Sequence, residues 1–341
     1  MGVDLKNLIK KETLSLNNLS RRTLAIDAYN ALYQFLAVIR GGWGEPLMDK
    51  QRRITSHLSG LFYRNINFLE RGIKLVYVFD GKPPEIKERE IERRRKFKRE
   101  ATEKYMKAFK AGKVDEVRKY AQSTSQLETK MVEDAKKLLT IMGIPWVQAP
   151  SEGEAQAAYM ARKGEVWAAV SQDHDSLLFG ATRLVRNLTI SGKRKLPGKN
   201  VYVTIDPERV DLDKILKDLS ITREQLVDIG ILIGTDFNPD GFKGIGPMKA
   251  LKLIKSHKSL DNIPDMQKQI ASIDYQTIRN IFLNPEVTDS FELRWSKPDI
   301  VSIVDFLCHE RDFSEERVRS AIARFEFIER KKSETLERWF S

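Results

Sequence analysis

Cysteine is almost absent from this chain of 341 residues, in which Cys308 is the single example. One thiol cannot form an intrachain disulfide, and it excludes the zinc sites that are built from several cysteines. Long hydrophobic runs are missing as well: no apolar stretch reaches the ~18 residues that a membrane-spanning helix requires, and the N-terminal residues lack the apolar core of a secretion signal. We therefore expect a soluble, intracellular protein, with Cys308 as a small core residue.

Acidic residues are fewer than basic residues. The chain has 59 Lys and Arg against 48 Asp and Glu, which gives a net charge of +11. This excess favours a polyanionic partner, and nucleic acid is the first candidate. Hydrophobic residues make up 41% of the sequence, which is enough to build one large or two moderate globular domains.

Two phosphate-handling motifs are missing too. The sequence contains no G-x-x-x-x-G-K-[ST] loop, and the segment A-I-D-A-Y-N at 25–30 has no second acid two residues after Asp27. These absences argue against a kinase or a phosphatase.

Two close pairs of acidic residues organise the middle of the chain. Glu152 with Glu154 and Asp173 with Asp175 are separated by a short amphipathic helix and an apolar run that predicts a buried strand. Acids crowded in this way repel one another unless a cation lies among them, and hard divalent cations such as Mg²⁺ take oxygen ligands. The pattern predicts a metal site.

A simpler alternative is that each pair only caps a helix. Ser151 with Glu154 fits the capping box S-x-x-E, and the segment from Asp173 to Ser176 could cap the helix that follows. Acids in a first helical turn are also favoured by the helix dipole. The two interpretations can be separated only with the rest of the chain.

The N-terminal part of the sequence predicts a parallel α/β sheet. Apolar runs at 21–26 and 74–80 are typical of strands, and helical spacing lies between them at 31–39 and 56–71. Strands that alternate with helices in this way form mostly parallel sheets with helices on both faces.

Acidic residues stand at the ends of these strands. Asp27, Asp80 and Asp173 each end a predicted strand, and Glu152 follows another at 146–148. A single Asp at a strand end is usually a turn residue. In an open parallel sheet, however, the carboxyl ends of the strands form the active site, so we expect these four acids to converge.

A long basic helix is predicted from about 85 to 119. The segment 82–120 holds 15 Lys or Arg against 8 Asp or Glu, so most of the excess charge lies here. The mixed signs are compatible with a solvated helix stabilised by ion pairs. Arg93, Arg94 and Arg95, close after a strand-end acid, could instead place cations beside a metal-bound phosphate.

Later segments suggest contacts to a nucleic-acid backbone. Residues 181–203 have six Lys or Arg and no acid, and they predict a basic β-hairpin. A helix that starts with the capping box at 222–225 ends at Gly234, and Gly244 and Gly246 flank a turn before a new helix. Backbone N–H groups at such a helix start can bind a phosphate, although an ordinary helix connector has the same pattern. Residues 261–330 are expected to be helical.

Seven motifs resemble, in order, the structure-specific 5′ nucleases, and the nearest match is flap endonuclease of the archaeal and eukaryotic kind. They are M-G-V at 1–3, A-I-D-A-Y-N at 25–30, V-F-D-G-K-P-P at 78–84, E-G-E-A-Q-A at 152–157, S-Q-D-H-D-S at 171–176, G-T-D-F at 234–237 and G-I-G-P-x-x-A at 244–250. The resemblance covers nearly the whole chain.

The resemblance implies a PIN-like α/β fold with a mixed central sheet flanked by helices, a helical arch and a helix-two-turn-helix unit. It implies metal ligands at Asp27, Asp80, Glu152, Glu154, Asp173, Asp175 and Asp236. It assigns catalytic roles to Lys87 and Arg94 on the arch. The implied DNA-binding residues are Tyr33, Thr55, Arg64, Glu152, Gly234, Asp236, Gly244 and Gly246, of which Thr55 and Arg64 match positions around a pocket for a one-nucleotide 3′ flap.

Cofactors and partners follow from the same resemblance. It implies two Mg²⁺ ions per site, with Mn²⁺ as a substitute, and K⁺ at the helix-two-turn-helix. The tail resembles the binding box for the sliding clamp PCNA through Leu336, Trp339 and Phe340, although Ser333 stands where the family has Gln. The loop before Thr55 also lacks the Gly that the family pattern predicts.

The expected activity is structure-specific 5′ flap endonuclease and 5′–3′ exonuclease in Okazaki fragment maturation and base excision repair. Expected partners are branched DNA and the clamp. The chain is expected to be a monomer on its own, cytoplasmic in an archaeon or nuclear in a eukaryote.

We expect one nuclease domain at 1–330. It is made of an N-terminal part (1–111) with the arch from about 82, an internal part (112–260) with the helix-two-turn-helix at about 223–257, and C-terminal helices (261–330); 331–341 is a tail. The alternatives are a non-catalytic clamp-associated scaffold and a related nuclease that cuts junctions or bubbles.

Overall fold

The computed structural model describes residues 2–42, 44–111, 116, 120, 124, 126–195 and 202–326. The clamp-binding residues of the tail therefore lie outside the described residues. No helix in these ranges is long and apolar enough to cross a membrane.

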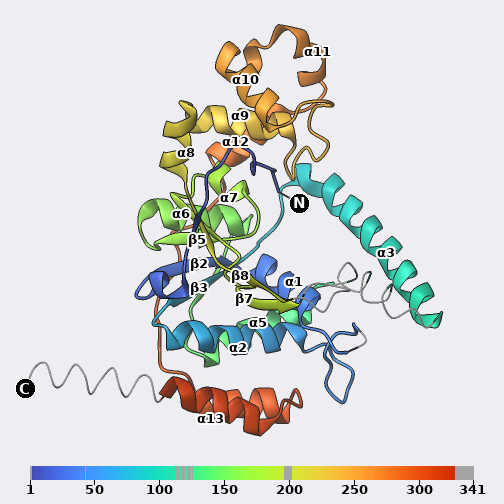
Figure 1. Cartoon of the computed structure of the whole chain (residues 1–341), viewed down its shortest axis with the longest axis vertical. Coiled ribbons are helices and arrows are strands. Elements are labelled where there is room, and N and C mark those ends of the chain that lie inside the picture. Colours follow the sequence, from blue (N-terminus) through green and yellow to red (C-terminus); the bar gives the residue numbers. More distant parts are fainter. Residues whose placement is uncertain are drawn as a thin grey trace, which may run out of the picture.

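A seven-stranded mixed sheet forms the centre of the molecule (Figure 1). Its strands lie in the order β1-β9-β6-β5-β2-β3-β4. Their bounds are β1 Glu12–Thr13, β2 Thr23–Asp27, β3 Lys74–Phe79, β4 Trp146–Gln148, β5 Ala168–Val170, β6 Arg183–Arg186 and β9 Glu208–Asp211. The strands from β6 to β4 are parallel, while β9 and β1 pair antiparallel at one edge. The predicted parallel α/β core is confirmed, and antiparallel strands at one edge make the whole sheet mixed.

Helices cover both faces of this sheet. The helices are α1 Ala28–Val38, α2 Ser56–Glu70, α3 Glu88–Lys110, α5 Thr129–Ile141, α6 Gly153–Lys163, α7 Asp175–Leu178, α8 Leu212–Leu219, α9 Arg223–Ile233, α10 Pro247–His257, α11 Gln267–Ile270, α12 Tyr275–Leu283 and α13 Ile300–Val304. Figure 1 shows α2 and α5 on one side of the sheet and α6 and α7 on the other. Each predicted helix of the N-terminal half begins and ends within three residues of its expected bounds, except the long basic one.

Alternating side chains of β3 separate two hydrophobic cores. Leu75, Tyr77 and Phe79 pack with apolar residues of α1, α2 and α5, whereas Val76 and Val78 pack toward α6. A central strand buried on both faces is expected to be apolar throughout, and β3 is fully buried after its first residue. This alternation fixes the register, and with it the place where the strand ends before Asp80.

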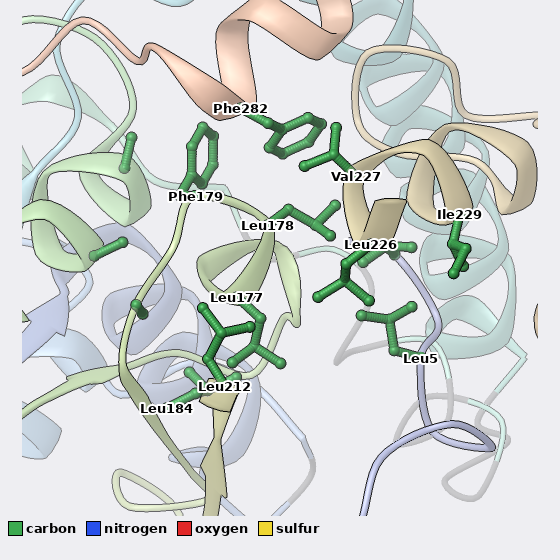
Figure 2. Packing of buried hydrophobic residues seen from close by; sticks show 14 of the residues in the cluster. Leu5, Leu177, Leu178, Phe179, Leu184, Leu212, Leu226, Val227, Ile229 and Phe282 are labelled. Carbon is green, nitrogen blue, oxygen red and sulfur yellow. The ribbon is translucent and has the colours of Figure 1, made fainter. Parts of the chain in front are cut away.

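The second core also attaches the C-terminal helices. Phe179, directly after α7, lies 4.8 Å between ring centroids from Phe282 of α12 (Figure 2). Leu226 and Val227 of α9 are buried in the same cluster. These contacts join α9 and α12 to the sheet, so the turns at either end of α9 are held at a fixed place relative to the strand ends.

Three sequence predictions need correction. The long basic helix, α3, begins at Glu88 after a short 3-10 turn at Glu85–Lys87, and α3 ends at Lys110. The segment 181–203 is not one hairpin: β6 joins the main sheet, and the hairpin pairs β7 Gly192–Lys195 with β8 Tyr202–Ile205. Residues 284–299 are not helical but form a segment without helix or strand between α12 and α13, in which Trp295 donates to the Leu75 carbonyl of β3.

Candidate active site

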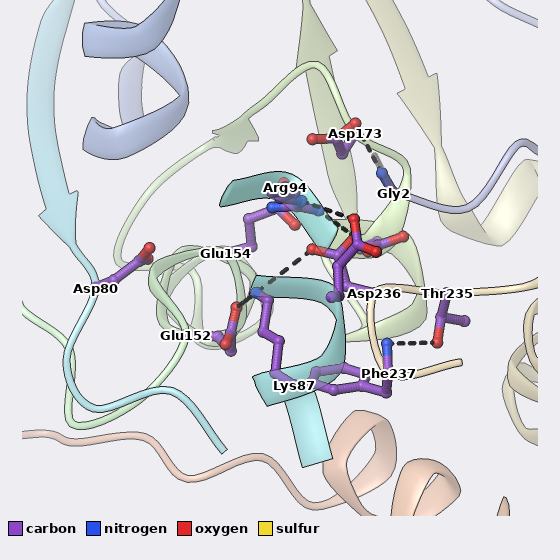
Figure 3. Close-up of polar contacts among 12 residues, drawn as sticks. Gly2, Asp80, Lys87, Arg94, Glu152, Glu154, Asp173, Thr235, Asp236 and Phe237 are labelled. Carbon is purple, nitrogen blue, oxygen red and sulfur yellow. Dashed lines mark hydrogen bonds and ion pairs between the residues drawn. The ribbon is translucent and has the colours of Figure 1, made fainter. Parts of the chain in front are cut away.

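The carboxyl ends of the parallel strands bring seven acidic side chains together. Asp27 ends β2, Asp80 follows β3, Glu152 precedes α6, and Asp173 follows β5. Glu154 and Asp175 lie in the first turns of α6 and α7, and Asp236 follows α9. Each of them interacts electrostatically with at least one other member of the group. In Figure 3, Glu152 and Asp236 lie at the tips of Lys87 and Arg94, with Asp80 to one side and Asp173 above. The convergence that the strand ends predict is therefore present.

Close backbone packing holds the Asp80 carboxylate. The N–H of Gly153 donates to Asp80 Oδ1 at 2.7 Å. A β-carbon at Gly153 would lie 2.6 Å from the same oxygen. A side chain at this helix start would therefore displace the Asp80 carboxylate from its present position.

The N-terminal residues of the chain hold the second acidic pair. The N–H of Gly2 donates to Asp173 Oδ1 at 3.2 Å, and the N–H of Val3 donates to Asp175 Oδ1 at 2.7 Å. Glu154 accepts hydrogen bonds from the Ser171 hydroxyl and, at 3.4 Å, from the Ser176 hydroxyl. Each of these three carboxylates is thus oriented by neutral donors.

The capping alternative does not describe either pair. The N-cap residue of α6 is Glu152, and no side chain caps this helix, so Ser151 and Glu154 do not form a capping box. The N-cap of α7 is His174, also without a side-chain cap bond. The four carboxylates are directed to the cluster rather than to the helix ends.

Two cationic side chains of the basic segment enter the cluster (Figure 3). Lys87 Nζ lies 2.5 Å from Glu152 and 3.4 Å from Asp236. Arg94 Nη2 lies 2.6 Å from Asp236, and its Nε lies 2.8 Å from Glu90 on its own helix. The segment after Asp80 therefore places cations where the acids converge.

Burial and mutual repulsion raise the pKa values of several of these acids. Burial raises the pKa of Asp80 to about 6, and the charges of Glu152 and Asp236 act in the same direction. Burial raises the pKa of Asp175 to about 7, and Asp236 and Asp173 add to this effect. The protonated form is favoured because too little positive charge lies nearby.

The same causes act on the most deeply buried members. Burial raises the pKa values of Asp27 and Glu154 well above their ordinary range, and neighbouring carboxylates contribute. Burial alone would also raise the pKa of Asp236, but Arg94 and Lys87 more than offset it and lower this pKa. Those two cations compensate one part of the cluster and leave the other part short of positive charge.

The residues present fit hard divalent cations. Seven carboxylates supply only oxygen donors, the ligand type that Mg²⁺ and Mn²⁺ prefer, and their raised pKa values indicate that the cluster lacks positive charge. Within the described ranges, no three acidic, His or Cys side chains are arranged closely enough to hold an ion as they stand. Lys87 and Arg94 form ion pairs with Glu152 and Asp236 in this conformation.

The sequence matches the XPG N-terminal domain over residues 1–101 and the XPG I-region over residues 143–236. These two ranges contain all seven acids together with Lys87 and Arg94. Over 341 residues, the chain is 56% identical to flap endonuclease 1 of Pyrococcus furiosus, with 100% of this chain and 99% of that protein aligned. It is 58% identical over 328 residues to flap endonuclease 1 of Ignicoccus hospitalis, covering 95% and 93% of the two chains.

The chain belongs to the flap endonuclease 1 family. Among solved structures, flap endonuclease-1 of Methanococcus jannaschii superposes with a TM-score of 0.77 at 43% identity, over 97% of this chain and 100% of that one. The catalytic core of Rad2 in complex with DNA substrate shares the fold, with a TM-score of 0.70 at 24% identity over 95% and 100% of the chains. The predicted family and fold class are confirmed.

The residues that the family resemblance assigns to DNA binding lie in three places. Tyr33 of α1 faces the arch helix α3, where Lys98 Nζ lies 4.2 Å from the centre of its ring. Gly244 and Gly246 flank the turn before α10, in space that no other atom fills within 4 Å, and Gly234 ends α9 with φ +111°. The turn at Gly244 and Gly246 is thus exposed, as a phosphate contact would require, whereas Gly234 packs against the backbone of Pro239 and Gly241.

Thr55 and Arg64 do not join the carboxylate cluster. Thr55 is the buried N-cap residue of α2, although its side chain makes no capping bond. Arg64 donates to the carbonyl of Ser191 at 2.7 Å. In the loop before Thr55, Arg52 adopts φ +61°. A residue other than glycine therefore has the left-handed conformation in this loop.

Several site residues were not singled out by the sequence analysis. Gly153, Ser171 and Ser176 each contact a carboxylate, and Phe237 lies under Lys87 with its ring centre 5.8 Å from Nζ. Their positions inside the acidic motifs were the available signal. Asn30, whose backbone N–H donates to Asp27, lies three residues after the end of β2 on α1, and no sequence pattern pointed to it individually.

Proposed function

We propose that this chain is a structure-specific 5′ flap endonuclease that hydrolyses phosphodiester bonds near the base of 5′ flaps in DNA with two divalent metal ions. The observation that carries the proposal is the insertion of Lys87 and Arg94 into a cluster of seven carboxylates at the carboxyl ends of the sheet. Membership of the flap endonuclease 1 family supports it. The chain is accordingly a nuclease of a metal-dependent family, and Mg²⁺ is the metal that we propose.

The ligands that we propose are Asp27, Asp80, Glu152, Glu154, Asp173, Asp175 and Asp236. Two divalent ions in such a site supply a hydroxide nucleophile at neutral pH and stabilise the leaving 3′-oxygen. Mn²⁺ has the same preference for oxygen ligands and is the proposed substitute.

Lys87 and Arg94 would bind the scissile phosphate. In the present conformation their charges are neutralised by Glu152 and Asp236. When a phosphate enters the site, the same nitrogens can donate to its oxygens and stabilise the charge that develops during hydrolysis. Tyr33 would stack beside the scissile nucleotide, and the 3-10 turn at Lys87 together with the arch helix α3 would bring the two cations to the DNA strand.

Contacts away from the cluster would hold the duplex without reading its sequence. The turn at Gly244 and Gly246 is exposed, and no side chain caps α10 after it, so the first N–H groups of this helix would bind a backbone phosphate. We propose K⁺ as a further ligand there. Thr55 and Arg64 are proposed to contact a one-nucleotide 3′ flap, and the family role implies function in Okazaki fragment maturation and base excision repair, with 5′–3′ exonuclease activity.

We propose that residues 1–330 act as one nuclease domain and that 331–341 bind PCNA through Leu336, Trp339 and Phe340. The chain is proposed to be a monomer on its own. Deleting 331–341 should abolish binding to the clamp while cleavage in the absence of the clamp stays unchanged. A truncated chain that still binds the clamp would overturn this assignment.

The decisive experiment is cleavage of a labelled double-flap DNA with Mg²⁺. We expect cutting one nucleotide inside the duplex, loss of cutting in Asp173→Ala with DNA binding retained, and weak cutting of a bubble. Asp218→Ala, which removes an exposed acid paired with Lys10, is the matched control and should cut normally. DNA binding without any cutting by the wild type would favour the scaffold, and equal cutting of the bubble would favour the related nuclease.

A further inference from the structure

A directed chain of hydrogen bonds runs from Asp173 to the loop that follows β6. The side-chain amide of Asn30 donates to Asp173 Oδ2 at 3.5 Å. Gln34, one helical turn further along α1, donates to Asn30 Oδ1 at 2.6 Å. The Thr189 hydroxyl then donates to Gln34 Oε1. We call these three residues, Asn30, Gln34 and Thr189, the amide relay.

The polarity of the amide relay allows one orientation of each amide. The Asp173 carboxylate can only accept, so the NH₂ group of Asn30 faces it. The oxygen of Asn30 then accepts from Gln34, which leaves the oxygen of Gln34 to accept from the Thr189 hydroxyl. A rotated Asn30 would place its oxygen against a carboxylate oxygen, which is repulsive.

Asp173 is held at both of its oxygens as a result. Gly2 donates to Oδ1 and Asn30 donates to Oδ2. The backbone N–H of Asn30 also donates to Asp27 Oδ1 at 3.0 Å, so this residue contacts two members of the cluster. One N–H on each oxygen fixes the plane of the Asp173 carboxylate and leaves the remaining lone pairs for other partners.

The far end of the amide relay borders a cavity of about 270 Å³. Gln34 and Thr189 line it together with Arg64 of α2 and Ser191. Arg64 donates to the Ser191 carbonyl at 2.7 Å and so attaches the loop of Thr189 to α2. Arg64 therefore supports the relay from the opposite end to Asp173.

We propose that Gln34 and Asn30 are positioning residues that hold Asp173 in the orientation in which it binds a divalent metal ion, and that Thr189 supports them by donating to the outer amide oxygen. This inference rests on the metal site of the proposed function. Partners that orient metal ligands contribute substantially to metal affinity, and their loss lowers it by about 10- to 100-fold. The proposed role of Gln34 and Asn30 is exerted through Asp173 and requires no direct contact with the metal or the DNA.

The test is Mn²⁺ binding without DNA, measured by electron paramagnetic resonance and by calorimetry. Thr189→Val removes the hydroxyl at nearly constant volume and should weaken Mn²⁺ binding about 10-fold, whereas Thr189→Ser should bind like the wild type. Gln34→Leu should resemble Thr189→Val. Asn67→Leu is the matched control, because Asn67 lines the same cavity and its amide is outside the relay.

The variant Gln34→Glu distinguishes the effect of amide orientation on Mn²⁺ affinity from the effect of an added negative charge. A carboxylate at position 34 cannot donate to Asn30, so the Asn30 amide would rotate and present its oxygen to Asp173. The relay then predicts weaker Mn²⁺ binding, whereas the added negative charge alone would make binding tighter. Tighter or unchanged binding in Gln34→Glu would overturn the proposal.

Two controls keep the outcomes distinct. Thermal unfolding without metal should give the same midpoint for Thr189→Val and Thr189→Ser, so that a lost affinity is not a folding defect. A wild type that binds no Mn²⁺ would contradict the metal site itself. A wild type that binds Mn²⁺, with Gln34→Leu and Thr189→Val binding equally well, would contradict only the relay.

Discussion

Arg94 of the arch helix forms a 2.6 Å ion pair with Asp236, which lies 142 residues further along the chain. The pair joins the arch to the loop after α9 across the carboxylate cluster. Because the Arg94 guanidinium has the geometry to bind two oxygens of a phosphate, the same group can exchange the carboxylate for DNA. Its position next to the cluster gives it a different role from the neighbouring arginines.

Arg94→Ala should lower single-turnover cleavage of a double flap by about 100- to 1,000-fold. The matched control is Arg93→Ala, since Arg93 pairs with the fully exposed Asp240 at the surface. We expect the control to change the cleavage rate less than threefold. Similar losses in both variants would show that charge on the helix, and not the position of Arg94, is what matters.

Gly153→Ala should damage the site although it adds only a methyl group. The new β-carbon would lie 2.6 Å from Asp80 Oδ1 and 3.1 Å from the Val78 carbonyl. We expect a loss of about 1–3 kcal/mol in the free energy of unfolding and a higher Mg²⁺ concentration for half-maximal cleavage. Gly42→Ala, with no atom within 4 Å of its β-carbon, should leave both quantities unchanged. A Gly153→Ala protein with wild-type Mg²⁺ dependence would refute the proposed contact.

Arg52→Gly should stabilise the protein. Arg52 has φ +61°, a backbone conformation that costs a side-chain-bearing residue about 1 kcal/mol and glycine almost nothing. The greater freedom of glycine in the unfolded chain cancels part of this gain, so we expect an increase of a few tenths of a kcal/mol. Urea unfolding of Arg52→Gly and of Arg52→Ala, which keeps the strain, measures the difference. Equal stability of the two variants would exclude strain at this turn.

The sequence predicted the acidic residues at the strand ends better than the contacts that surround them, and the reason is physical. Asp27, Asp80 and Asp173 end apolar strands, and the rule that parallel strands end at one edge brings them together without knowledge of any distance. Lys87 and Arg94 could be assigned only through the family resemblance, because spacing along a polar helix does not show which cation points to the cluster.

Other contacts depend on tertiary packing that no local pattern contains. The hydrogen bonds from Gly2 and Val3 to the second acidic pair span more than 170 residues. Residues 284–299 were expected to be helical, yet they form no helix or strand, and Trp295 among them donates to the backbone of β3. The amide relay could not be predicted from the sequence for the same reason, since Thr189 and Gln34 are distant in the sequence.

His57 should make the stability of the fold depend on pH. It is fully buried in α2, and among the described residues neither ring nitrogen has a hydrogen-bond partner. Burial lowers its pKa to about 3, and the charge of Arg311 acts in the same direction. Below pH 6.5, the ordinary pKa of histidine, His57 is protonated in the unfolded chain but stays neutral in the folded chain. The contribution of His57 is therefore complete above pH 6.5 and is lost as the pH falls toward 3.

His57→Leu should remove this dependence. Between pH 6 and pH 4 the free energy of unfolding of the wild type should fall more steeply than that of His57→Leu, by about 1.4 kcal/mol per pH unit, because one proton is involved. Urea unfolding at pH 7.5, 6, 5 and 4.5 gives both slopes. His309→Gln, which changes an exposed histidine paired with Asp305, should keep the wild-type slope. Parallel curves for the wild type and His57→Leu would mean that His57 finds a proton acceptor in the folded protein, and its burial would then not oppose protonation.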